Sequence, residues 1–208
     1  MGSLGNENLS TIIAKILEDL EKFFQAREQL IKKSRDIFPL IRDVFKYAHK
    51  RELEKAQKVM EEVNERIRAI QKLIEGDYRL ISTGIWHDLA REYVEAILFL
   101  QIINKCLTNS KDDKLPTPQQ LGVETVSWIL GLCEVVGELK RQILLTIHNN
   151  EYNIAWCYLD WIRKIYDEVS KIALPSSIIP NLKAKIDYIR NILVSSEEIL
   201  VRIEKKIQ

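Results

Sequence analysis

The sequence predicts an all-α protein, built as a single bundle of about six long antiparallel helices. The chain has 208 residues, the length of one domain, so residues 1–208 are expected to share one core. With 46% hydrophobic and 29% charged residues, it is neither disordered nor fibrous. Only 7 glycines and 5 prolines interrupt it, which is few for the many turns of an all-β sandwich. Apolar residues recur at helical spacing, and no alternating strand pattern competes.

The expected helices follow from this spacing and from the residues that interrupt it. They cover about residues 8–49, 51–74, 84–107, 123–148, 151–173 and 181–206. Asn8 or Ser10 suits the first N-cap, and Gly76 suits the end of the second helix. Pro39 is expected to kink the first helix or to end it near Phe38.

Hydropathy and cysteine spacing restrict the class of protein. The longest stretch without a charge, Ile172–Leu182, is too short to cross a bilayer, and the N-terminus lacks the pattern of a signal peptide. Cys106, Cys133 and Cys157 are odd in number and widely spaced, so neither a disulfide framework nor a zinc cluster is expected. A reducing, cytoplasmic location is therefore predicted.

Two largely apolar helices each carry a pair of acids. Glu134 and Glu138 lie inside the apolar segment 123–148, about 40° apart around the helix. Glu92 and Glu95 lie three residues apart on one face of the segment 84–107. If the two polar stripes face each other, four carboxylates converge.

Converged carboxylates repel one another and need protons or a cation. Oxygen ligands without cysteine or histidine suit Mg²⁺ or Mn²⁺ rather than Zn²⁺. In the alternative interpretation the acids are solvated, or they pair with nearby basic side chains (Lys105, Lys140, Arg91 or Arg141). A di-iron centre is disfavoured because neither Glu92 nor Glu134 has a histidine three residues further on.

The segment 22–55 is locally basic, although the whole chain has a net charge of only +1. It holds ten basic residues against five acids, with aromatic residues interleaved. Charge for phosphates and rings for stacking are what a single-stranded nucleic acid requires. The alternative is a solvated helix whose aromatic side chains turn into the core.

Three segments together resemble the translin family, and most closely its Trax (translin-associated factor X) branch. Residues 27–37 (REQLIKKSRDI) resemble the first-helix motif of the family, and residues 91–96 (REYVEA) resemble the Trax acid motif. Residues 128–141 (WILGLCEVVGELKR) are similar to the Trax motif Gly-x-x-Asp-x-x-Gly-Glu-Leu-x-Arg, except that Glu134 replaces the aspartate.

The resemblance implies an all-α subunit of an octamer that encloses nucleic acid, with Mg²⁺-dependent endoribonuclease activity in its Trax branch. By motif, the metal-binding, catalytic residues would be Glu92, Glu95, Glu134 and Glu138. The predicted substrate is single-stranded or short structured RNA, and single-stranded DNA is a further ligand. Residues expected to bind the phosphates are Arg27, Lys33, Arg35 and Arg141. The alternatives are a translin-like oligomer that binds nucleic acid without cutting it, and a scaffold for protein partners.

Overall fold

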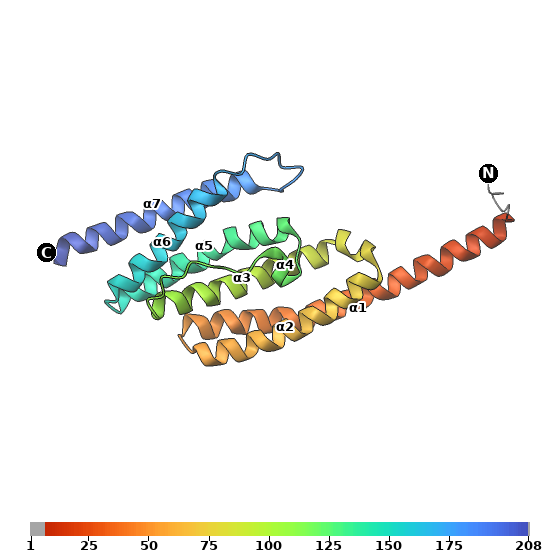
Figure 1. Cartoon of the computed structure of the whole chain (residues 1–208), viewed down its shortest axis with the longest axis horizontal. Helices are drawn as coiled ribbons and strands as arrows, with labels where there is room; N and C mark the ends of the chain where they lie inside the picture. Colours follow the sequence, from red (N-terminus) through yellow and green to blue (C-terminus); the bar gives the residue numbers. More distant parts are fainter. Residues whose placement is uncertain (1–6, 208) are drawn as a thin grey trace.

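The computed structural model describes residues 7–207 (Figure 1), and within that range the chain forms helices and no strand. In chain order the elements are α1 (Leu9–His49), α2 (Leu53–Gly76), the 3-10 helix η1 (Tyr78–Ser82), α3 (Gly84–Leu107), α4 (Pro118–Leu121), α5 (Thr125–His148), α6 (Tyr152–Val169) and α7 (Leu182–Ile207). The all-α prediction is confirmed. The six expected helices correspond to α1, α2, α3, α5, α6 and α7, and the short α4 and η1 are additional.

The first helix contradicts one of the two outcomes expected at its proline. Asn8 caps the helix, because its side chain accepts a hydrogen bond from the Thr11 backbone N–H at 2.9 Å. The helix does not end near Phe38; it continues through Pro39 to His49. Ile37 and Ile41, on either side of the proline, are each only 1% exposed. Their burial in the core offsets the backbone hydrogen bond that proline cannot donate.

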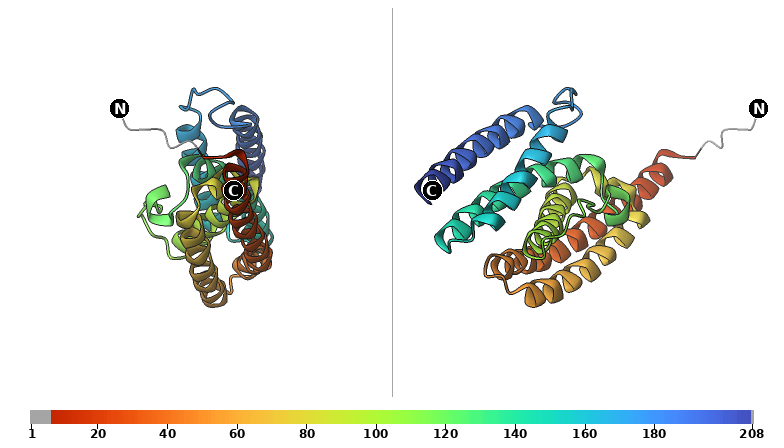
Figure 2. Two further views of the ribbon diagram at one scale, coloured as in Figure 1. Left: turned by 90° about the vertical axis from the view of Figure 1, so that its right-hand side faces the viewer. Right: turned by 60° about the vertical axis from the view of Figure 1, so that its left-hand side comes forward.

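Helices α3 and α5 form the middle of the bundle. Helix α3 packs against α1 and α2 on one side and against α5 on the other, and α5 packs in turn against α6 and α7 (Figures 1 and 2). A continuous apolar core runs between these layers. The acid-bearing helices therefore lie next to each other with other helices on both sides.

The N-terminal part of α1 extends beyond the rest of the bundle (Figure 1). Its apolar side chains are exposed, for example Leu17 at 53% and Phe24 at 60%. Despite this exposed apolar surface, none of the helices within residues 7–207 combines the length and apolarity that a membrane span requires.

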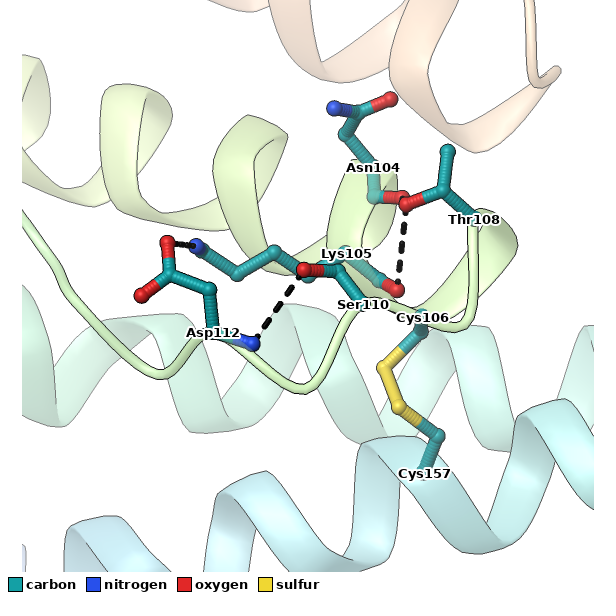
Figure 3. Close-up of a disulfide and its surroundings, with 7 residues drawn as sticks. All are labelled: Asn104, Lys105, Cys106, Thr108, Ser110, Asp112 and Cys157. Atoms are coloured by element: carbon teal, nitrogen blue, oxygen red, sulfur yellow. Dashed lines mark hydrogen bonds and ion pairs between the residues drawn. A yellow bond between two sulfur atoms is a disulfide. The ribbon is translucent and has the colours of Figure 1, made fainter.

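A disulfide joins Cys106 at the end of α3 to Cys157 in α6, with 5.7 Å between their Cα atoms (Figure 3). The expectation of unpaired cysteines is therefore wrong, and so is the argument from cysteines for a reducing compartment. The two cysteines are 51 residues apart in sequence, and they meet only because α3 and α6 pack together. Cys133 on α5 is free and buried.

Candidate acid cluster between α3 and α5

A glycine allows the two acid-bearing helices to approach closely. Gly131 on α5 faces α3, where a Cβ would lie 2.8 Å from the carbonyl oxygen of Arg91 and 2.8 Å from Val94 Cγ1. Any larger residue would push the helices apart. Gly131 is three residues before Glu134, and Arg91 adjoins Glu92, so the contact brings the two acid pairs to the same level of the bundle.

The α3 acids are half-buried and have no ion-pair partner among the described residues. The pKa of Glu95 is raised to about 8, first by burial and then by the negative charges of Glu134, Glu92 and Glu138. The pKa of Glu92 is also raised, first by burial and then by Glu134. Both shifts have the direction expected for carboxyl groups that are partly buried near other negative charges.

Glu134 on α5 has two cationic neighbours. Lys185 Nζ on α7 lies 2.7 Å from one carboxylate oxygen and donates a hydrogen bond to it. Arg91 Nε on α3 lies 3.0 Å from the other, as an ion pair without hydrogen-bond alignment. The pairing of an acid with Arg91 was one of the alternatives from the sequence, whereas Lys185 was not foreseen.

Glu138 is held by a histidine from α1. His49 Nε2 lies 2.6 Å from Glu138 Oε2, and this hydrogen bond is the main reason why the pKa of Glu138 is lowered. Burial of the carboxylate opposes the shift, and the charge of Arg141 adds to it. Local sequence patterns do not reveal this contact, because His49 and Glu138 are 89 residues apart.

The donor set suits a divalent cation in kind, since it consists of carboxylate oxygens in a partly buried, negatively charged site. Within residues 7–207, however, no three acidic, histidine or cysteine side chains are arranged so that they could hold a metal ion together. Glu134 and Glu138 instead contact the protein's own N–H donors. The convergence of four acids on one cation therefore stays a prediction, and a metal would require at least one of these contacts to be exchanged.

The predicted phosphate-binding residues occupy two places. Arg141 is exposed on α5 beside Glu138, without an ion-pair partner in the described part of the chain. Arg27, Lys33 and Arg35 lie on α1, where Arg27 pairs with Glu28 at 3.3 Å while Lys33 and Arg35 are exposed.

Arg42 connects the basic part of α1 to the acids. It is exposed, and its charge lowers the pKa of Glu92 against the stronger effect of burial. Arg35, Arg42 and His49 are each seven residues apart, which places them along nearly the same face of α1. One face of α1 therefore leads from exposed cations to the acid cluster. This signal was available in the sequence as a heptad spacing.

Comparison with known proteins agrees with this architecture. The model of the translin family matches residues 25–204, which is most of the chain. The chain belongs to the translin family. Among curated relatives, an uncharacterized protein of Methanocaldococcus jannaschii is 27% identical over 172 residues, a match that covers 80% of this chain and 71% of the relative. Translin-associated protein X of Mus musculus is 24% identical over 193 residues, covering 74% of this chain and 65% of the mouse protein.

Solved structures of C3PO proteins share the fold of this translin-family chain. The AfC3PO–duplex RNA complex superposes with a TM-score of 0.79 at 19% identity, over 93% of this chain and 97% of that one. The structure of apo-NeC3PO gives a TM-score of 0.75 at 19% identity, over 97% and 98% of the two chains. At these identities the likeness concerns the fold.

Proposed function

We propose that this translin-family protein is a metal-dependent endoribonuclease that cleaves single-stranded or short structured RNA inside an oligomeric shell. The observation that carries the proposal is Glu95, a half-buried carboxyl group on α3 whose pKa is raised by burial and by the charges of Glu134, Glu92 and Glu138, and which has no ion-pair partner among the described residues. Such an arrangement costs stability, and proteins keep strongly shifted acids mainly where they have work to do. The resemblance of residues 91–96 and 128–141 to the Trax motifs, which implies this activity, supports the same proposal.

Glu92, Glu95, Glu134 and Glu138 would hold Mg²⁺ or Mn²⁺. When bound, the cation would supply charge neutralisation at the scissile phosphate and a more acidic water. The raised pKa of Glu95 favours its neutral form, and a bound cation would favour the carboxylate form instead. Without a bound cation, Lys185 and Arg91 balance the negative charge of Glu134. Arg141, beside Glu138, is placed to contact a phosphate of the substrate.

The basic face of α1 would bind the nucleic-acid backbone. Arg35 and Arg42 are exposed along the face that leads to the acids, and Arg27 and Lys33 add charge nearby. The neighbour structure of AfC3PO contains duplex RNA, which supports RNA as the ligand of this fold. Backbone contacts carry no base preference, so single-stranded DNA is expected to compete.

The exposed apolar face of α1 supports assembly into a homo-oligomer, with an octamer as the proposed state. Soluble monomers rarely expose a contiguous apolar surface of this kind. The residues concerned are Leu9, Ile12, Ile13, Ile16, Leu17, Leu20 and Phe24. Copies of the chain that cover these residues would enclose an interior that small RNAs could enter. Light scattering of the purified protein would give the number of subunits.

A cleavage assay tests the proposal directly. Labelled single-stranded RNA is incubated with the wild type in Mg²⁺, Mn²⁺ or EDTA, and with Glu92→Gln and Glu95→Gln. We expect cleavage that requires the metal and falls at least about 100-fold in either variant. Glu61→Gln, which alters an exposed acid on α2, is the matched control and should cleave normally. Cleavage that persists in EDTA, or equal activity in the α3 variants, would contradict the proposal.

The alternative is an oligomer that binds single-stranded RNA or DNA without cutting it. It is favoured by the compensation of Glu134 and Glu138 within the protein, and by the lack of a three-ligand metal arrangement among the described residues. In the same assay it predicts salt-dependent RNA binding and no metal-dependent cleavage. A scaffold for protein partners alone would show neither.

A further inference from the structure

A polar cavity lies between α2, α3 and α4, and none of the four candidate acids lines it. Its volume of about 370 Å³ is within the range of small-molecule sites. Asn64, Arg68 and Gln71 line it from α2, where their spacing of four and three residues places them on one face of the helix. Tyr93 lines it from α3 and Gln120 from α4. Among the described residues no acidic side chain lines the cavity, so Arg68 makes it positively charged.

Internal hydrogen bonds hold the walls of this cavity in place. Gln71 Nε2 on α2 donates to the carbonyl oxygens of Leu121 (2.8 Å) and Gly122 (3.0 Å) at the end of α4. Gly122 has a φ of +63°, and a Cβ there would lie 2.6 Å from Gln71 Nε2, so the close contact requires glycine. Tyr93 is only 5% exposed, and its hydroxyl donates to Asn64 Oδ1 at 2.9 Å. The cavity is therefore formed by the fold itself.

These hydrogen bonds use acceptors of the lining residues and leave donors free. Asn64 accepts through Oδ1 from Tyr93, and Gln120 accepts through Oε1 from the backbone N–H of Thr117 at 2.8 Å. Each amide keeps an NH₂ group, which donates to no acceptor within residues 7–207. Arg68 is exposed and has no ion-pair partner in the same part of the chain. Two amide donors and one guanidinium therefore line a single cavity.

Such a set of donors suits an anion that carries several acceptor oxygens. A guanidinium keeps its charge at every physiological pH and forms paired hydrogen bonds with phosphate or carboxylate oxygens. A phosphate monoester offers three such oxygens and about two negative charges, whereas a carboxylate offers two oxygens and one charge. The phosphate therefore matches three groups of donors better. The cavity is larger than a phosphate group, which leaves room for the organic part of an ester.

We propose that this cavity binds a phosphate monoester, with Arg68 as the charged anchor and the amides of Asn64 and Gln120 as further donors. A free nucleotide and the terminal phosphate of an RNA are two sources of the same group. The inference concerns a second site, remote in chemistry from the acids of α3 and α5. It does not depend on the proposed nuclease activity.

Three substitutions test the donors without disturbing the walls. Arg68→Gln removes the charge from an exposed position. Asn64→Asp and Gln120→Glu keep the oxygen that accepts the internal hydrogen bond but replace the free NH₂ group by a carboxylate oxygen. Glutamate is also a normal residue at this position of a capping box. Arg66→Gln is the charge-matched control, because Arg66 lies on the same helix, pairs with Glu62 and does not line the cavity.

Calorimetry of the full chain with inorganic phosphate and with adenosine 5′-monophosphate measures the affinity. For the wild type we expect a Kd below about 1 mM for the nucleotide. The affinity should fall at least about 10-fold in each of the three variants and stay within about twofold in Arg66→Gln. Circular dichroism confirms that the variants fold. Equal affinity in the wild type and in folded Arg68→Gln overturns the proposal, and so does a wild type that binds no phosphate compound.

A short RNA with and without a 5′-phosphate separates the two sources. If the phosphate strengthens RNA binding at least about threefold in the wild type but not in Arg68→Gln, the site binds RNA ends. If the nucleotide binds and the RNA phosphate makes no difference, the site takes free nucleotides; both results support the proposal. A chain that binds phosphate here without cutting RNA contradicts only the nuclease. A chain that cuts RNA without binding any phosphate compound at this cavity contradicts only the present inference.

Discussion

The acids of α3 and those of α5 have the same chemistry but opposite surroundings. On α5, Glu134 contacts Arg91 and Lys185, and Glu138 contacts His49. On α3, neither Glu92 nor Glu95 has an ion-pair partner among the described residues, and burial raises the pKa of both. The α5 acids therefore help to hold helices together, whereas the α3 acids cost stability. Groups that cost stability are the better indicators of function.

The strongest test of this contrast is to neutralise one acid on α3 and, separately, one on α5. The α3 substitution is Glu95→Gln. The pKa of Glu95 is about 8 in the folded chain against 4.5 for an ordinary glutamate. Between these values the folded state binds more protons than the unfolded state, so Glu95 lowers the free energy of unfolding as the pH rises. Glu95→Gln should therefore raise it by up to about 5 kcal/mol at about pH 9, and by little at about pH 4. Urea denaturation without divalent cations measures the change.

Glu134→Gln is expected to act in the opposite direction. It leaves Lys185 without its carboxylate and Arg91 with only Asp88, at 3.4 Å, so stability should fall by about 1–2 kcal/mol near neutral pH. The same denaturation series provides the comparison with Glu95→Gln. If both substitutions shift the transition the same way, the distinction between the α3 and α5 acids is wrong.

The contact that brings the two helices together can be altered at a single position. Gly131→Ala places a Cβ 2.8 Å from α3 atoms and should lower the free energy of unfolding by about 1–3 kcal/mol. Gly137→Ala, on the same helix, is a matched control, because its Cβ would meet only the Tyr188 hydroxyl at 3.6 Å. There the better helix propensity of alanine should leave stability equal or slightly higher. Equal losses at both glycines would contradict the close α3–α5 contact.

A smaller effect is expected from the lysine on α7. Lys185→Met removes one of the two cations beside Glu134 and should lower stability by about 1 kcal/mol. It should also raise the pKa of Glu95 further, because Lys185 now lowers it. Thermal unfolding and the pH dependence of stability report the two effects. Lys183→Met, at an exposed position on the same helix, should show neither.

The sequence predicted what depends on local pattern. The long helices begin and end within a few residues of their expected bounds, since apolar spacing and caps act over one or two turns. The two acid pairs were found for the same reason: charges inside apolar helices contradict their surroundings. His49, Lys185 and the partner of Cys106 were missed, because each meets its partner only through packing between distant segments. Pro39 does not end α1, because the side chains on both sides of it are buried in the core and stabilise the helix.

The link between Cys106 and Cys157 has a topological consequence. It closes residues 106–157 into a covalent ring that contains the whole of α5, including Glu134 and Glu138. Helix α3, which carries the other two acids, runs directly into that ring. If α1 frayed or α7 detached, the disulfide would still hold the ends of α3 and α6 together, so the segments that carry the four carboxylates would stay close. After such an opening, the cluster can re-form from a small range of conformations, because α3 and α5 cannot separate far.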